Sequence, residues 1–255
     1  MADYLTYPFR TMRITQNYNG STSHYGHSHG TPRDYPVDEG GSDSGRDPIY
    51  APCDLIINRI YGVGTSGVNT LWVESLGKVW MPSGKVDYIS MQITHPNDSD
   101  LRRLKVGQIV KKGAVLCYEG TDGATGNHIH LSVGRGKISG NGWTQNSRCK
   151  YVLTTTGGTL KPEDAFFVDP QFTKVVNKAG IAFKQLPAAS KTKAVTYKTT
   201  DVLNIRAGAG TTYAVVGQYG KGTKINVTKT MTAGGLTWGR TADGWVCLKY
   251  AKKVK

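Results

Sequence analysis

Short runs of β-branched and aromatic residues, separated by turn-forming residues, recur along the whole chain. Glycine accounts for 32 of the 255 residues, so tight turns can follow one another closely. Strand-like runs are expected at residues 55–61, 70–73, 87–93 and 128–133. Helical periodicity is weak, and the best candidate is residues 161–167, where Pro162 stands near the start. We therefore expect a mainly β protein with antiparallel sheets.

Composition excludes two classes of protein. Hydrophobic residues make up 38% of the chain and charged residues 20%, which is unlike a disordered tail. No apolar run approaches the roughly 20 residues that span a bilayer. Residues 1–4 show no charged segment followed by an apolar stretch, so we expect no signal peptide and synthesis in the cytoplasm.

Residues 184–194 divide the chain. They combine Pro187 with small residues and Lys, which is typical of a linker. We therefore expect one domain over residues 1–183 and a second over residues 195–255. Residues 191–255 hold twelve Lys/Arg and two Asp/Glu, so +10 of the formal net charge of +14 lies there. Such a module suits an anionic partner, although solubility alone would also explain the charge.

The four Cys residues show no CxxC pair, so neither a zinc ribbon nor a redox motif is indicated. Cys117 and Cys247 lie in apolar runs and are expected in the core. Free thiols suit a protein made in the cytoplasm, and a disulfide stays open at this point.

All six His residues lie in the first expected domain. Three cluster at His24, His27 and His29, and Asp38 follows them. His128 and His130 are two apart in a strand-like run, so their side chains would share one face of a strand. Imidazole and carboxylate are ligands that zinc prefers, and a catalytic zinc has three protein ligands and one open position. The alternative is a pair of ordinary His residues on a strand.

Residues 13–133 resemble the lysostaphin-type zinc endopeptidases, which cut peptidoglycan cross-bridges. The resemblance rests on collinear segments: residues 47–52, the glycine-rich residues 104–113, and residues 119–130, which end in His-x-His. It implies an antiparallel-sheet metallopeptidase domain that binds Zn²⁺.

Carried over residue by residue, the resemblance makes Asp38 and His130 zinc ligands. It makes His128 the general base, and His95 a residue that orients water or stabilises the developing oxyanion. The family spaces its first His and Asp four residues apart, whereas His24 lies fourteen residues before Asp38. An insertion at a hairpin tip would explain the difference. The sequence context favours His24 as the third ligand with His27 as its rival, and the remaining cluster His residues are expected in an exposed loop.

Residues 203–213 resemble the opening signature of bacterial SH3-type wall-binding domains, and the likeness extends over residues 195–251. It implies a small SH3-like β-barrel. Trp245 is expected in its core. Tyr213 and Trp238 are candidates for contact with a ligand.

Together these features predict a phage endolysin: a zinc endopeptidase that hydrolyses peptide bonds of stem peptides or cross-bridges. Its partner would be the peptidoglycan of a Gram-positive wall, reached from the host cytoplasm at lysis, and we expect a monomer. The alternative is a non-catalytic wall-binding protein on a degenerate peptidase scaffold. Nucleic-acid binding lacks any supporting signature. Residues 65–67 and 134–147 are expected to be loops that shape the substrate groove.

Overall fold

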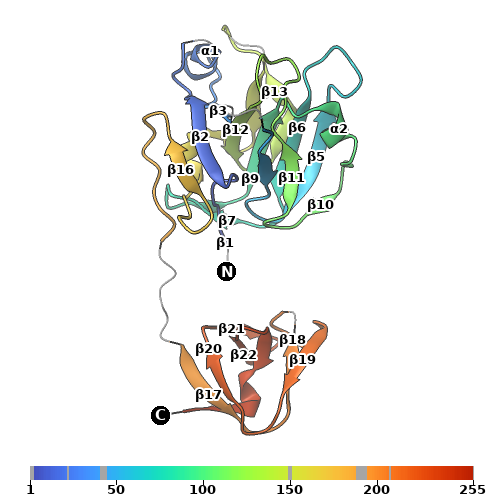
Figure 1. Ribbon diagram of the computed structural model, residues 1–255, viewed down its shortest axis with the longest axis vertical. Helices are drawn as coiled ribbons and strands as arrows, with labels where there is room; N and C mark the ends of the chain where they lie inside the picture. Colours follow the sequence, from blue (N-terminus) through green and yellow to red (C-terminus); the bar gives the residue numbers. More distant parts are fainter. Residues whose placement is uncertain are drawn as a thin grey trace. The chain divides into compact units, whose positions relative to one another are not determined.

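The structure is a computed structural model that describes residues 3–21, 23–40, 45–148, 151–187, 194–206 and 208–254. The chain divides into two units, Met1–Leu186 and Pro187–Lys255, each drawn in Figure 1. Both consist mainly of β-strands in antiparallel sheets, which confirms the expected fold class. Residues 188–193 of the expected linker lie outside the described residues. The assignment of the two units as a peptidase and a wall-binding domain stays a prediction.

A nine-stranded sheet forms the centre of the first unit. In spatial order its strands are β10 (Ile109–Val110), β5 (Leu55–Tyr61), β6 (Thr70–Ser75), β9 (Ile89–Thr94), β12 (Ile129–Arg135), β3 (Val37–Glu39), β2 (Thr11–Gln16) and β16 (Lys174–Asn177), with β15 (Thr159–Leu160) also on β12. The pairs are antiparallel, except that β16 runs parallel to β2. The expected strands at residues 55–61, 70–73 and 128–133 are therefore present.

Smaller sheets and short helices surround the large sheet. They are β1 (Asp3–Tyr4) with β7 (Val79–Trp80) and β8 (Val86–Asp87), β4 (Pro48–Tyr50) with β11 (Val115–Tyr118), β13 (Ile138–Thr144) with β14 (Val152–Thr155), and helices α1 (Tyr25–His29), α2 (Asp98–Leu101) and α3 (Pro162–Ala165). Helix α3 confirms the helix expected near Pro162. The run at residues 87–93 is divided between β8 and β9.

The central strands present opposite chemistry on their two faces, because side chains alternate along a strand. On β9, Met91 and Ile93 are fully buried in the hydrophobic core. The intervening Gln92 and Thr94 point to the other face, as does His130 of the neighbouring β12. The apolar face therefore fixes the sheet in place, and the polar face is left for a site.

The second unit holds two antiparallel sheets. One contains β20 (Lys224–Val227), β17 (Val195–Thr199) and β24 (Ala251–Lys253), and the other contains β19 (Val215–Tyr219), β18 (Leu203–Arg206), β23 (Trp245–Cys247), β22 (Leu236–Arg240) and β21 (Lys229–Ala233), with the short helix η1 (Leu248–Tyr250) before β24. The core residues include Leu203, Ile225 and Val246. The SH3-like assignment of this unit stays a prediction.

The burial of two Trp residues differs in part from the expectation. Trp238 is 2% exposed and its indole N–H donates to the backbone oxygen of Ala233 at 3.2 Å. Trp245 is partly buried and packs against the core cluster that contains Trp238. Both residues lie on inner strands of the sheet, Trp238 on β22 between β21 and β23 and Trp245 on β23 between β18 and β22. Trp238 is therefore a core residue, whereas Tyr213 is exposed and its contact with a ligand stays a prediction.

The thiols of Cys53, Cys117 and Cys247 are free and buried, so the expected core positions of Cys117 and Cys247 are confirmed. Cys149 lies outside the described residues. Within the part of the chain that the structure describes, no helix combines the length and apolar character needed to cross a bilayer.

The large sheet yields a paired test of core packing. Ile57 on β5 is 1% exposed and Ile109 on the adjacent β10 is 53% exposed. Ile57→Ala should lower the free energy of unfolding by about 2–5 kcal/mol, because it leaves a cavity in the core. Ile109→Ala should change it by about 0.5 kcal/mol or less. Denaturant titration of both variants measures the difference, and equal losses would show that β5 does not bury its core face.

Candidate metal centre

Two neighbouring strands place Asp38 beside His130. Strands β3 and β12 pair antiparallel, with Asp38 directly opposite His130. Directly opposed residues point to the same face of a sheet, with their Cβ atoms about 5 Å apart. His130 in turn lies opposite Thr94 on β9. A carboxylate and an imidazole are therefore side by side on the polar face of the sheet.

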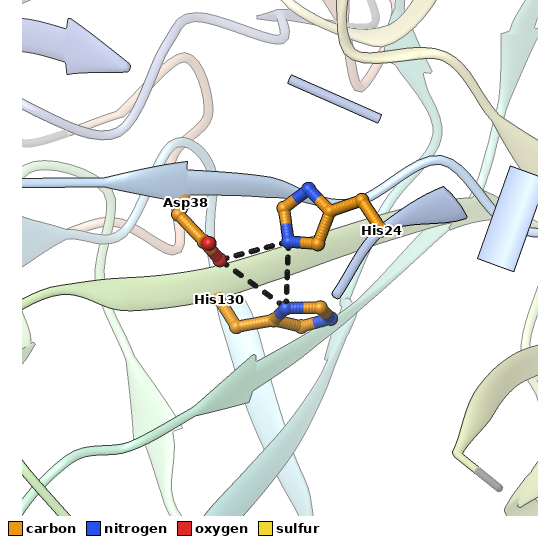
Figure 2. Close-up of side chains that lie close together, drawn as sticks. All are labelled: His24, Asp38 and His130. Carbon is orange, nitrogen blue, oxygen red and sulfur yellow. Dashed lines mark hydrogen bonds and ion pairs between the residues drawn. The ribbon is translucent and has the colours of Figure 1, made fainter. Parts of the chain in front are cut away.

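His24 completes the cluster from outside the sheet. It is the N-cap residue of α1 and is fully buried. Its Nε2 atom lies 2.9 Å from Oδ1 of Asp38 and 3.1 Å from Nδ1 of His130. Nδ1 of His130 lies 3.3 Å from the same Oδ1 atom. Figure 2 shows the three side chains pointing toward one another, and these atoms form the cluster that fits a metal ion among the described residues.

The hydrogen bonding of His24 suits a cation at this cluster. Its Nδ1 atom lies 2.9 Å from the backbone oxygen of Asn17, which can only accept a hydrogen bond. Nδ1 therefore donates to Asn17, which leaves Nε2 as the ring nitrogen that faces the carboxylate of Asp38 and can offer a lone pair to a metal ion. Acceptor atoms at this separation repel unless a positive charge lies between them. A tetrahedral zinc bound at about 2.0–2.1 Å separates its ligand atoms by roughly 3.3 Å, so the three donors fit the ion.

The charge states of the cluster favour metal binding. Burial acts to raise the pKa of Asp38, but the close approach of His130 and His24 outweighs it and holds the pKa well below its usual value. Burial lowers the pKa of His130 to about 4. An ionised carboxylate and a neutral imidazole are the forms that coordinate a metal. The second oxygen of Asp38 accepts a hydrogen bond from Gln16 at 2.8 Å, which fixes the orientation of the carboxylate.

His95 and His128 lie beside the cluster as a second pair. Their ring centroids are 4.5 Å apart, and Nε2 of His128 is 3.9 Å from Oδ1 of Asp38. Nδ1 of His95 contacts the backbone oxygen of Asp122 at 2.7 Å, and Nδ1 of His128 contacts that of Gly126 at 2.9 Å. Both rings therefore donate from Nδ1, which leaves Nε2 of each ring as the nitrogen available for proton transfer. These are the positions that suit proton transfer at the site.

The backbone of His95 is held in an uncommon conformation. Its φ angle is +83°, in the left-handed region that non-glycine residues rarely adopt. Its backbone N–H donates to the backbone oxygen of Asn69 at 2.9 Å. Burial lowers the pKa of His95, so the neutral ring is favoured. Strain of this kind persists where the surroundings fix a residue, and it is concentrated at functional sites.

The expectation of an exposed loop around His27 and His29 is wrong. Both residues lie on α1, and only His29 is exposed, stacked on Tyr25. His27 is 7% exposed and its Nδ1 donates to Asp34 at 2.6 Å. That hydrogen bond occupies Nδ1 of His27, whose ring centroid lies 5.1 Å from that of His130, and it is His24 rather than His27 that joins Asp38 and His130 in the donor cluster.

A cavity of about 160 Å³ adjoins the cluster. His95, His130 and His27 line it together with the aromatic side chains of Tyr61, Trp72, Trp143 and Tyr151. Residues 134–147 were expected to be a loop here, but most of them belong to β12 and β13. Trp143 therefore reaches the cavity from a strand. The cavity gives the site an apolar surface that can hold part of a substrate.

Sequence reasoning missed the residues that orient the cluster. Gln16 and Asn17 bind Asp38 and His24, and Asp34 binds His27 and accepts a further hydrogen bond from Ser132 at 2.8 Å. Nothing in the sequence spacing marks Gln16 or Asn17, because β2 and β3 must first pair to bring them to the site.

Comparisons with known proteins give distant structural likenesses. No family profile and no curated protein matches the chain. Similar solved structures include lysostaphin in solution, at 16% identity and a TM-score of 0.34 over 83% of this chain and 78% of the other. The antimicrobial peptidase lysostaphin from Staphylococcus simulans is 15% identical, with a TM-score of 0.31 over 94% and 85%. A zinc-containing peptidase from Vibrio cholerae is 22% identical, with a TM-score of 0.33 over 52% and 36%. At such scores these likenesses support no argument about the site, which rests on its own residues.

Metal content distinguishes the two pairs of His residues. His130→Ala should abolish zinc binding, because the ion would lose one of three protein ligands. His128→Ala should retain stoichiometric zinc, because its imidazole lies outside the three-donor cluster. Elemental analysis of the two folded proteins measures this. Zinc in His130→Ala, or its absence from His128→Ala, would contradict the assignment.

Proposed function

We propose that the protein is a zinc-dependent endopeptidase that hydrolyses peptide bonds of peptidoglycan, in stem peptides or cross-bridges. The observation that carries the proposal is the cluster of His24, Asp38 and His130, whose donor atoms converge beside two further His residues. Three protein ligands and an open position are the arrangement of a catalytic zinc. The adjoining aromatic cavity supplies a surface for the substrate.

The chemistry divides between the metal and the neighbouring imidazoles. Zinc, when bound, supplies Lewis acidity and makes hydroxide available near neutral pH. His128 is the general base, because its Nε2 atom faces the cluster and can accept a proton. The same proton can then pass to the leaving amine. His95, held by Asp122, would orient water or stabilise the developing oxyanion. Hydrolysis in this way needs no Ser or Cys nucleophile.

We further propose that the second unit directs the enzyme to the wall of a Gram-positive bacterium, as in a phage endolysin. Its net charge of +10 over residues 191–255 and its SH3-like sequence signature support this role. Such an enzyme would be held in the host cytoplasm before lysis and would then act on the wall. A non-catalytic wall-binding protein is the alternative, and the convergence of all three donor residues argues against it.

Digestion of purified peptidoglycan tests the activity. The full-length protein loaded with zinc should release fragments with new amino and carboxyl ends, which mass spectrometry of the digest would identify together with the bond that is cut. His128→Ala should be slower by roughly 10²–10⁴-fold, the usual contribution of a general base. A zinc-loaded wild-type protein that binds walls but cleaves no peptide bond would favour the non-catalytic alternative.

Removal of the second unit tests targeting. Residues 1–186 alone should hydrolyse soluble muropeptides at the full-length rate but lyse whole cells much more slowly. The reason is the high effective concentration of an anchored domain at its substrate. Turbidity clearance at two salt concentrations compares the two proteins on cells, and the full-length protein should lose part of its advantage as salt screens charge. Equal lysis by both proteins would remove the targeting role.

A further inference from the structure

Three lysines form a row across one sheet of the second unit. Lys198 on the central strand β17 lies directly opposite Lys224 on β20 and directly opposite Lys252 on β24. All three side chains are exposed. In antiparallel pairs, directly opposed residues point to the same face with Cβ atoms about 5 Å apart. The row therefore presents three ammonium groups to solvent over roughly 10 Å.

This arrangement opposes the stability of the sheet. Like charges directly across a strand pair are destabilising. Segment 194–254 contains two carboxylates, and both are engaged elsewhere. Asp201 accepts a hydrogen bond from the backbone of Val202 at 2.7 Å, and Asp243 accepts one from the hydroxyl of Tyr219 at 2.5 Å. The repulsion is therefore not offset by acidic residues of this segment, and an external anion would relieve it.

The chemistry around the row indicates which anion fits. The opposite face of the sheet packs Ile225 and Val227 into the core, with Tyr197 against them. The next positions on the lysine face are Thr196 and Asn226, which are hydrogen-bonded at 3.0 Å. The face thus offers ammonium groups, a hydroxyl and an amide, without an aromatic ring from these strands. Single-stranded nucleic acids are bound through aromatic stacking as well as charge, so this face suits phosphates linked by polar, non-aromatic units.

We propose that Lys198, Lys224 and Lys252 bind the phosphodiester groups of a linear polyol-phosphate polymer of the cell envelope. This inference rests on the proposed function, in which the second unit attaches the enzyme to the wall. The row contacts more than one phosphate at once, and Thr196 and Asn226 lie where they can bind the polyol hydroxyls. The sheet thereby supplies an anchoring site that does not depend on peptide recognition.

A binding experiment with the full-length protein tests the proposal. The probe is fluorescent poly(glycerol phosphate) of defined length, and the variant carries Lys198→Gln, Lys224→Gln and Lys252→Gln together. Three phosphate contacts predict that wild-type affinity falls by about tenfold or more between 50 and 200 mM salt. The triple variant should bind at least about tenfold more weakly at low salt and lose most of this salt dependence. The matched control is Lys229→Gln, on β21 of the other sheet. It removes one positive charge outside the row, as Lys198→Gln removes one within it.

Stability separates a binding role from a structural one. Lys198→Gln should weaken binding while leaving the unfolding temperature equal or higher, because it removes a charge repelled from both sides. Lys198→Glu should raise the unfolding temperature further and abolish binding. Unchanged polymer binding by the triple variant, or an equal loss in Lys229→Gln and Lys198→Gln, would overturn the proposal.

Two further comparisons identify the chemistry of the partner and separate polymer binding from hydrolysis. An oligonucleotide with the same number of phosphates should bind more weakly than the polyol phosphate, and tighter binding that depends on the three lysines would overturn the proposal. The triple variant should hydrolyse soluble muropeptides at the wild-type rate, and His130→Ala should bind the polymer normally. A wild-type protein that binds the polymer but does not hydrolyse muropeptides would refute only the proposed peptidase activity. A wild-type protein that hydrolyses muropeptides but does not bind the polymer would refute only the proposed anchoring site.

Discussion

The antiparallel pairing of β3 with β12 is the interaction on which the candidate site depends. It sets Asp38 beside His130 on the polar face, while Val37, Ile129 and Leu131 are buried on the other. A shift of one residue in this register would turn Asp38 toward the core and abolish the cluster. The apolar residues that fix the register therefore also fix the spacing of two metal donors. The contacts that stabilise the sheet are therefore the same contacts that position the metal donors.

His24 belongs to a less regular part of the fold. It reaches the sheet from the start of α1, and the backbone oxygen of Asn17 fixes which ring nitrogen faces Asp38. His95 and His128 are likewise oriented by backbone oxygen atoms, those of Asp122 and Gly126. Backbone acceptors thus set the tautomers of the imidazoles around the cluster. Such outer contacts are a general means of orienting metal ligands and bases.

The sequence predicts the parts of this arrangement that depend on local pattern. Alternating apolar runs mark the strands, and the spacing of His128 and His130 marks the site. The sequence leaves open whether His24 or His27 is the third metal ligand, because the choice depends on the hydrogen bond between His27 and Asp34 and on the turn of α1. The burial of Trp238 and the alignment of three lysines also escape prediction, because both follow from strand pairing between distant segments.

Anomalous X-ray diffraction at the zinc edge, from crystals of the zinc-loaded full-length protein, tests the central claim most directly. The account predicts one strong peak about 2.0–2.2 Å from Nε2 of His24, Oδ1 of Asp38 and Nδ1 of His130. Nε2 of His128 would lie outside that coordination sphere. A peak at His27 and Asp34, or full-occupancy zinc without His24 among its ligands, would contradict the account.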